Sequence, residues 1–393
     1  MPKYMLHSRR VLAGEDLKAV ENAAVVVEDA RIAFVGSRTE AEARYPGCAA
    51  VDLGGATLMP GMIDCHSHTS LDARVPGHLE MMNDPVPDLT IRGVNNVRDD
   101  LLSGVTTVRI LGEKGYADVS IRNAIAAGAL EGPRLLVAGI GMRSLHGHGY
   151  VGVAHTGPGE FRLTCRENLL RRVDWLKIFV TGGAPPAGGS RYIPTFVTPE
   201  ELAVVTGEAK MAGVRSSAHC IGGPGLAACV AAGIDVIDHA YCATDADLEL
   251  VARNGRWICL TPSVFMDRER NTKNPPGLAR NIELGRDWVV DSMRKIVRSG
   301  VSYAIGSDAL HGGLALEAKY AVELGAQAAD ALAGVTVKAA RLCGIAEKTG
   351  SLTPGKFADI VAVEGDPRDD IGSLGKVVFV MKEGKTVGSG HGR

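Results

Sequence analysis

The chain lacks the features that mark nucleic-acid-binding, membrane-spanning and secreted disulfide-rich proteins. Its 393 residues carry a formal net charge of −2 and no long basic run, so no nucleic-acid partner is expected. No apolar run reaches the roughly 18 residues of a membrane span, and the first residues lack the apolar segment of a secretory signal. The eight cysteines are scattered without a Cys-x-x-Cys pair, which predicts reduced, mostly buried thiols. We therefore expect a cytoplasmic protein that has no membrane partner.

Aromatic residues are also scarce, at 5%, whereas glycine is abundant, with 49 residues. The glycines are dispersed without a period, which indicates many tight turns between short elements and not a linker or a repeat. The apolar share of 46% and the charged share of 22% are typical of a soluble globular enzyme. This length can fill one large barrel and a smaller accessory domain.

Both ends of the chain are rich in strand and turn signals. Two short apolar runs near the N-terminus are separated by a polar stretch, which predicts a hairpin, and the C-terminus has the same character. The strand-like runs are Ala23–Val27, Ile32–Val35, Ile360–Val363 and Val377–Met381. We predict that residues 1–56 and 350–393 together form one small β-sandwich domain.

The middle of the chain, residues 57–349, alternates short β-branched runs with helical stretches. The predicted strands are Thr57–Asp64, Thr106–Leu111, Arg134–Ile140, Trp175–Val180, Arg215–His219, Val236–His239, Trp257–Thr261 and Ser302–Ser307. Eight such alternations over roughly 250 residues are typical of a (β/α)8 barrel (TIM barrel) of the α/β class. A doubly wound open sheet is the structural alternative, but it needs fewer strands.

Metal-ligating side chains recur where the predicted strands end. These residues are His66, His68, His219, His239 and Asp308, and Lys177 lies within the fourth strand. Because the carboxyl ends of barrel strands converge on one face, we expect these side chains to share a cavity. Period-2 alternation aims His66 and His68 to the same side, and imidazole with a carboxylate suits zinc and similar divalent metals. If Lys177 does not belong to this cavity, its side chain would instead point outward, between the strand and a helix.

Several segments resemble the amidohydrolase superfamily and, within it, the branch with a binuclear metal centre. Gly61–His68 is similar to the first-strand motif, and Ser351–Val361 resembles the segment that returns to the composite β-domain. Lys177–Gly183 and Asp238–Tyr241 are similar to motifs of the Xaa-Pro dipeptidase and carboxypeptidase-like members. Imidazolonepropionase is another relative in architecture, but it lacks the bridging lysine. The resemblance covers essentially the whole chain.

The resemblance implies a site with two divalent metal ions. His66, His68 and Asp308 would hold one ion, His219 and His239 the other, and a hydroxide with N6-carboxylated Lys177 would bridge them. Zinc is the favoured metal, and the ligand types also admit manganese, cobalt and nickel.

The same resemblance implies a mechanism for cleaving an amide bond. The bridging hydroxide would attack the carbonyl, and Asp308 would act as base and then as acid. Tyr241 would hydrogen-bond the carbonyl oxygen, the alternative for Tyr241 being simple packing at the barrel mouth.

We expect a small-molecule substrate, a dipeptide or an N-acyl amino acid. In the long loop Gly139–Pro158, His146 resembles the relatives' residue near the substrate carboxylate, and Arg191 after the fourth strand is a candidate carboxylate clamp. His78 and His311 receive no role. Large barrels of this kind often assemble, so a homo-oligomer is compatible with the sequence.

Three other functions compete with amide hydrolysis. One is a mononuclear deaminase or a hydrolase acting on a cyclic amide or imine. A non-catalytic scaffold would be expected to have lost metal ligands, whereas all six positions are present here. A decarboxylase fits Tyr241 less well than carbonyl polarisation does.

Overall fold

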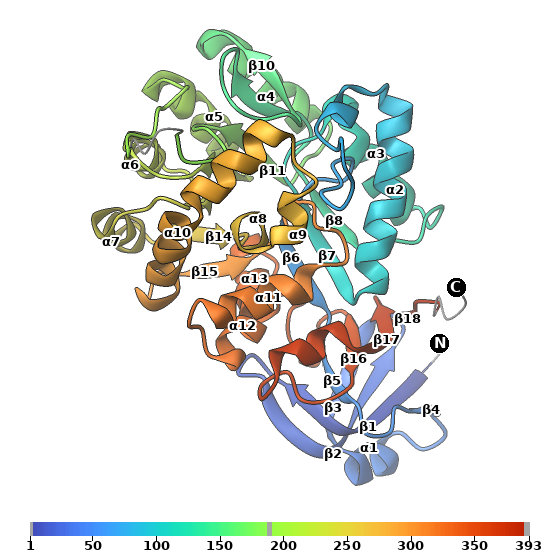
Figure 1. The fold of residues 1–393 in the computed structure, drawn as a ribbon. Helices are drawn as coiled ribbons and strands as arrows, with labels where there is room; N and C mark the ends of the chain where they lie inside the picture. The colour runs from blue at the N-terminus through green and yellow to red at the C-terminus, as the bar shows by residue number, and fades with distance from the viewer. Residues whose placement is uncertain (1–2, 187–190, 389–393) are drawn as a thin grey trace.

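The computed structural model of the chain describes residues 3–186 and 191–388, and its fold is of the α/β class. Figure 1 shows two regions: parallel strands surrounded by helices, and below them a sheet in which the blue N-terminal strands lie beside the red C-terminal ones. This arrangement agrees with the predicted (β/α)8 barrel and accessory β-domain.

Eight strands follow one another around the barrel, each parallel to the next where they pair. They are β6 (Met62–Ser67), β7 (Val105–Ile110), β8 (Arg134–Val137), β11 (Trp175–Phe179), β12 (Arg215–Cys220), β13 (Val236–His239), β14 (Trp257–Leu260) and β15 (Tyr303–Ile305). The last strand meets the first through backbone bonds, because Ser307 and Asp308 both donate to the carbonyl of His66, at 3.1 and 2.7 Å. Gly306 permits this approach, since a Cβ there would lie 2.5 Å from the His66 nitrogen.

Two predicted strands differ in the structure: one is divided between two sheets, and the other is shorter than predicted. The run Thr57–Asp64 becomes β5 (Thr57–Pro60), which pairs in the accessory sheet, and β6 in the barrel. They separate at Gly61, where any side chain would collide with Thr106 of β7. The run Arg134–Ile140 contains only β8, and the chain resumes as β9 (Gly141–Ser144), which pairs with β11. A further strand, β10 (Gly152–His155), extends this edge beside β9.

Helices cover the outside of the barrel, as Figure 1 shows. They are α2 (Val86–Leu102), α3 (Ala117–Ala126), α4 (Gly157–Leu170), α5 (Pro199–Ala212), α6 (Pro224–Ala232), α7 (Asp245–Arg253), α10 (Pro276–Arg298), α11 (Leu314–Glu323), α12 (Ala328–Gly334) and α13 (Val337–Cys343). Local capping fixes the ends of α5: Thr198 and Glu201 form a capping box at its start, and Gly213 ends it in the left-handed region. Between β14 and α10 lie two short helices that were not predicted, α8 (Ser263–Met266) and α9 (Arg268–Asn271).

The accessory sheet takes strands from both ends of the chain, in the order β18-β17-β16-β5-β1-β2-β3, with β4 beside β1. Besides β5, its members are β1 (Lys3–Ala13), β2 (Lys18–Glu28), β3 (Arg31–Ser37), β4 (Ala49–Asp52), β16 (Ile360–Val363), β17 (Val377–Lys382) and β18 (Lys385–Thr386). The predicted hairpin is confirmed, since β2 and β3 pair antiparallel, and the two predicted C-terminal runs pair antiparallel as β16 and β17. The boundaries at residues 56 and 350 stay a prediction. Helix α1 (Arg38–Arg44) packs against β2 and β3.

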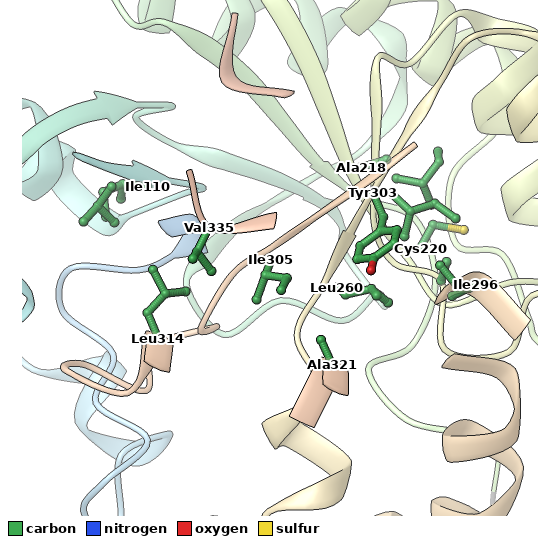
Figure 2. Packing of buried hydrophobic residues seen from close by; sticks show 14 of the residues in the cluster. Ile110, Ala218, Cys220, Leu260, Ile296, Tyr303, Ile305, Leu314, Ala321 and Val335 are labelled. Carbon is green, nitrogen blue, oxygen red and sulfur yellow. The ribbon is translucent and has the colours of Figure 1, made fainter. Parts of the chain in front are cut away.

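The main core fills the space between the barrel strands and the outer helices. Figure 2 shows part of it: Leu260 and Ile305 from the strands lie among Ile296, Leu314 and Ala321 from the helices. All eight cysteines are free, and seven of them are buried. In the described ranges, no helix has both the length and the apolar character that crossing a membrane would require.

Candidate metal centre

His66 and His68 lie at the end of β6, both buried. The Asp64 carboxylate holds this end in place, because its Oδ1 accepts from the backbone nitrogens of His66 and Ser307, at 2.9 and 3.0 Å. Burial raises the pKa of Asp64 to about 7. Nδ1 of His68 donates to the carbonyl of Gly112 at 3.1 Å, which leaves its Nε2 free to act as a ligand.

Asp308 follows β15 and faces the two histidines. Its Oδ1 lies 3.4 Å from Nε2 of His66 and 3.5 Å from Nε2 of His68. Burial alone would raise the pKa of Asp308, but hydrogen bonds from His66 and His68 and attraction to His66 and His239 outweigh it and hold the pKa well below its usual range. The donor atoms of these three side chains lie within 4.8 Å of one another, which is close enough for one metal ion.

His219 at the end of β12 and His239 at the end of β13 join the same group. The ring centroid of His239 lies 4.7 Å from that of His66 and 4.7 Å from that of His219. Burial, followed by repulsion from neighbouring histidines, lowers the pKa of both well below the ordinary value, so both rings are neutral. Neutral imidazole is the form that binds metal. Nδ1 of His239 bonds the Thr261 hydroxyl at 2.8 Å, which orients the ring.

Lys177 points into the barrel interior beneath the histidines and is fully buried. Its Nζ contacts the carboxylate of Asp238, which also accepts from Arg109 Nη2 at 3.0 Å and from the Ser217 hydroxyl at 2.7 Å. Burial lowers the pKa of Lys177 despite the attraction of Asp238. His66 Nδ1 lies 3.2 Å from Asp238 Oδ1 without the alignment of a hydrogen bond. The interior orientation rules out the outward alternative for Lys177.

A cavity of about 120 Å³ opens over this group. Tyr241 lines it and stacks on His239, with ring centroids 5.1 Å apart. The Tyr241 hydroxyl donates to the carbonyl of Thr261 at 3.0 Å, and burial raises its pKa. The structure thus brings five of the six predicted ligands and Tyr241 to the cavity wall, and Lys177 Nζ lies 5.2 Å from the ring centroid of Phe179, which also lines the cavity.

The two predicted substrate-binding residues lie elsewhere. His146 is exposed, with its Nδ1 2.9 Å from the Ser144 hydroxyl and its ring edge-on to Phe196. Arg191 is also exposed, with its guanidinium 5.5 Å from the ring centroid of Trp288. Among the described residues, neither contributes to the cavity lining.

His148, two residues after His146, does line the cavity. Its ring centroid lies 4.6 Å from that of His219, and burial lowers its pKa to about 4. Gly183 leaves room for this ring, since a Cβ there would lie 2.6 Å from it.

Sequence reasoning missed one wall of the cavity. This wall comes from the segment α8 to the start of α10 and is made by Val264, Arg270, Asn274, Leu278 and Ile282. His78, which had been given no role, also lines the cavity, and its Nδ1 bonds the carbonyl of Val75 at 2.9 Å. No motif in the sequence marks the α8–α10 segment, because its first two helices have only four residues each.

Comparisons with known proteins agree with this geometry. The model of the amidohydrolase family matches residues 57–387. The chain belongs to the amidohydrolase family. Ochratoxinase from Aspergillus niger is 29% identical over 94% of this chain and 84% of its own length. Imidazolonepropionase from Pseudomonas savastanoi pv. phaseolicola is 28% identical over 87% of this chain and 88% of its own.

A crystal structure of a Xaa-Pro dipeptidase with bound methionine superposes with a TM-score of 0.84 and 26% identity, covering 98% of this chain and 99% of that one. The chain is therefore a hydrolase of the amidohydrolase family, a family that generally binds metal ions.

Proposed function

We propose that this hydrolase cleaves the amide bond of a dipeptide or an N-acyl amino acid with the help of two divalent metal ions, zinc being favoured. The observation that carries the proposal is the meeting of His66, His68 and Asp308 around one point, with His219 and His239 on the wall of the same cavity. The relatives named as ochratoxinase and Xaa-Pro dipeptidase support an amide substrate.

The side chains fit a metal centre by their chemistry. His66, His68 and Asp308 would hold one ion and His219 and His239 the other, since neutral imidazole and carboxylate are ligands of zinc. When bound, such ions lower the pKa of a coordinated water and polarise a carbonyl. Nε2 of His66 and Nε2 of His68 both face Asp308 Oδ1, so the donor atoms of this group already point at one position.

Lys177 would be shared between the two ions after carboxylation of its ε-nitrogen. Only the neutral amine reacts with carbon dioxide, and the burial that lowers the pKa of Lys177 favours that form. The reaction requires Nζ to leave Asp238. The Asp238 carboxylate would then keep the Arg109 and Ser217 hydrogen bonds, so its charge would stay paired.

Asp308 and Tyr241 would handle the proton and the carbonyl of the substrate. Asp308 lies on the cavity wall beside Nε2 of His66 and Nε2 of His68, a position from which it would take the proton of the attacking water and pass it to the leaving amine. Tyr241 keeps its proton because its pKa is raised, so it stays a donor. To reach a substrate carbonyl, its hydroxyl must exchange the Thr261 carbonyl for that oxygen.

The cavity wall supports a compact substrate with an apolar part. Leu71, Leu79, Val151, Leu278 and Ile282 line it around the polar centre. We infer that His148 contacts the polar end of the substrate, because it lies on this wall whereas His146 and Arg191 do not. The roles predicted for His146 and Arg191 have no support from their positions.

A hydrolase or deaminase acting on a cyclic amide or imine is the second candidate. It is favoured by the imidazolonepropionase relative and by the fact that His66, His68 and Asp308 together suffice for one ion. One metal ion per chain with unmodified Lys177 would support this candidate.

The test is metal analysis of the purified protein followed by a screen of dipeptides and N-acyl amino acids. Reconstitution with and without bicarbonate, read by intact mass, reports whether Lys177 gains one carbon dioxide. We expect amide hydrolysis that depends on metal and is enhanced by bicarbonate. Full metal loading without hydrolysis of any amide in the library would contradict the proposed substrate class.

A further inference from the structure

Arg270 in α9 reaches across the cavity wall to the segment that carries Asp308. Its Nη1 donates to the carbonyl of Ser307 at 2.8 Å and lies 2.7 Å from the Ser263 hydroxyl, and its Nη2 donates to the carbonyl of Asp308 at 2.6 Å. The side chain is only 8% exposed. One guanidinium thus spans the two consecutive carbonyls on either side of the Asp308 α-carbon.

The backbone at this point has an uncommon conformation. Asp308 has φ of +49° and Ala309 φ of +68°, so two consecutive residues with side chains lie in the left-handed region. Such residues persist only where the surroundings hold them. Here the nitrogen of Asp308 is held by the His66 carbonyl, and its own carbonyl and that of Ser307 are held by Arg270.

We propose that Arg270 is a positioning residue that aims the Asp308 carboxylate at His66 and His68. The proposal rests on the proposed function, in which Asp308 is a metal ligand and a proton carrier. A planar guanidinium can bind three acceptors in fixed directions, which a lysine ammonium cannot reproduce. Arg270 Nη2 lies 3.9 Å from Asp308 Oδ2, so it also places a positive charge beside the carboxylate without taking Oδ1, the oxygen nearest the histidines.

A buried carboxyl group lies close to Arg270. Glu317 in α11 is fully buried, accepts from the Ser263 nitrogen at 2.8 Å, and has its Oε1 4.0 Å from Arg270 Nη1. Ser263 therefore joins Glu317 through its backbone and Arg270 through its hydroxyl. Because α8, α9 and the start of α10 also provide the apolar wall, a substrate pressing on Leu278 or Ile282 contacts the segment that positions Asp308.

The experiment titrates metal-free protein with Co²⁺ and follows its visible absorption, a readout that needs no substrate. Arg270→Met is compared with Arg268→Met, a matched control on the same helix whose side chain is 74% exposed and pairs with Glu283 on the surface. We expect Co²⁺ affinity to fall about 10- to 100-fold in Arg270→Met, as for other residues that orient a metal ligand, and to be unchanged in Arg268→Met.

Two milder variants keep the test valid if Arg270→Met folds poorly. Arg270→Lys should lose most of the Co²⁺ affinity that Arg270→Met loses, because lysine keeps the positive charge but not the planar guanidinium group. Ser263→Ala should lose less Co²⁺ affinity, in the same direction. With an amide substrate, kcat should fall more than KM rises, and added methylguanidine should partly restore kcat in Arg270→Ala.

Each outcome identifies the claim that fails. Wild-type affinity and kcat in Arg270→Met, Arg270→Lys and Ser263→Ala would overturn the positioning role. Wild-type protein that binds no Co²⁺ would instead contradict the metal centre on which the proposed function depends.

Discussion

Two groups of histidine and aspartate lie on either side of the segment that follows β15, and they share residue types but not surroundings. On the cavity side, Nε2 of His66 and Nε2 of His68 both face Asp308, at 3.4 and 3.5 Å. Behind it, Nδ1 of His311 lies 2.9 Å from Asp100 Oδ2, and Nε2 lies 2.9 Å from the carbonyl of Leu71.

The difference separates a structural pair from a ligand group. A carbonyl only accepts a hydrogen bond, and so does a carboxylate, so His311 must donate from both ring nitrogens as an imidazolium. Protein acceptors thus satisfy it completely, and it fixes Leu71 at the edge of the cavity. In the cavity group, the ring nitrogens that face Asp308 converge on one point, which is the arrangement that a metal ion requires.

Replacing the aspartate of each group gives the largest expected difference. Asp308→Asn should lower kcat by about 10²- to 10⁴-fold, because the amide cannot carry the proton, and should leave most of the metal bound. Asp100→Asn should leave kcat near wild type and lower only stability. Steady-state kinetics with metal analysis check this, and full activity in Asp308→Asn would exclude the proton-carrier role.

Tyr241 could belong to either side of the comparison, because its hydroxyl bonds the Thr261 carbonyl in this structure. If it donates to the substrate carbonyl, Tyr241→Phe should lower kcat by about 10²- to 10³-fold. If it only packs, the variant should lose about 1 kcal/mol in free energy of unfolding and keep its kcat. We expect the first result, and parallel kinetic and denaturation measurements distinguish the two.

The neighbouring residues His146 and His148 sharpen the comparison further. His148→Asn should raise KM about tenfold, since a hydrogen bond to a charged group contributes about 1.5–3 kcal/mol and 1.4 kcal/mol corresponds to tenfold. His146→Asn should leave KM unchanged, because this side chain lies outside the cavity lining. Equal KM values in both variants would remove His148 from the substrate site.

The smallest effect on turnover is expected for His311, whose contribution depends on pH. Burial alone lowers its pKa, but attraction and hydrogen bonding from Asp100 outweigh burial and raise the pKa above the ordinary 6.5. Because the folded-state pKa is the higher one, the stabilisation is complete below 6.5 and is lost as pH rises through the folded-state value.

His311→Asn should therefore lower the free energy of unfolding by about 1.5–3 kcal/mol at low pH and by less at high pH. Urea denaturation at several pH values measures this difference. A difference that does not change with pH would show that His311 is not an imidazolium.

The strand ends could be predicted from sequence because each barrel strand is a short apolar run that stops at a distinctive polar residue. That pattern places His66, His219, His239 and Asp308 together without any knowledge of register. The pattern did not indicate that Asp238 also points into the barrel, because strand alternation predicts that the side chains of neighbouring residues point to opposite faces. His239 has φ of +76°, so the backbone leaves the extended form and both residues enter the interior.

The second cavity wall could not be predicted, because four-residue helices are shorter than the window in which helical periodicity is visible. Arg270 is therefore indistinguishable in sequence from its exposed neighbour Arg268. The sequence also did not indicate that His148, and not His146, lines the cavity. In a glycine-rich loop, no regular period shows which side chain points inward.

Metal content per chain tests the central claim most directly. Wild-type protein, the double variant His66→Asn with His68→Asn, and His311→Asn are each incubated with Zn²⁺, freed of excess ion and analysed by mass spectrometry of the metal. The account predicts two ions in the wild type and in His311→Asn, and a clear loss in the double variant. Wild-type metal content in the double variant, or its loss in His311→Asn alone, would contradict the account.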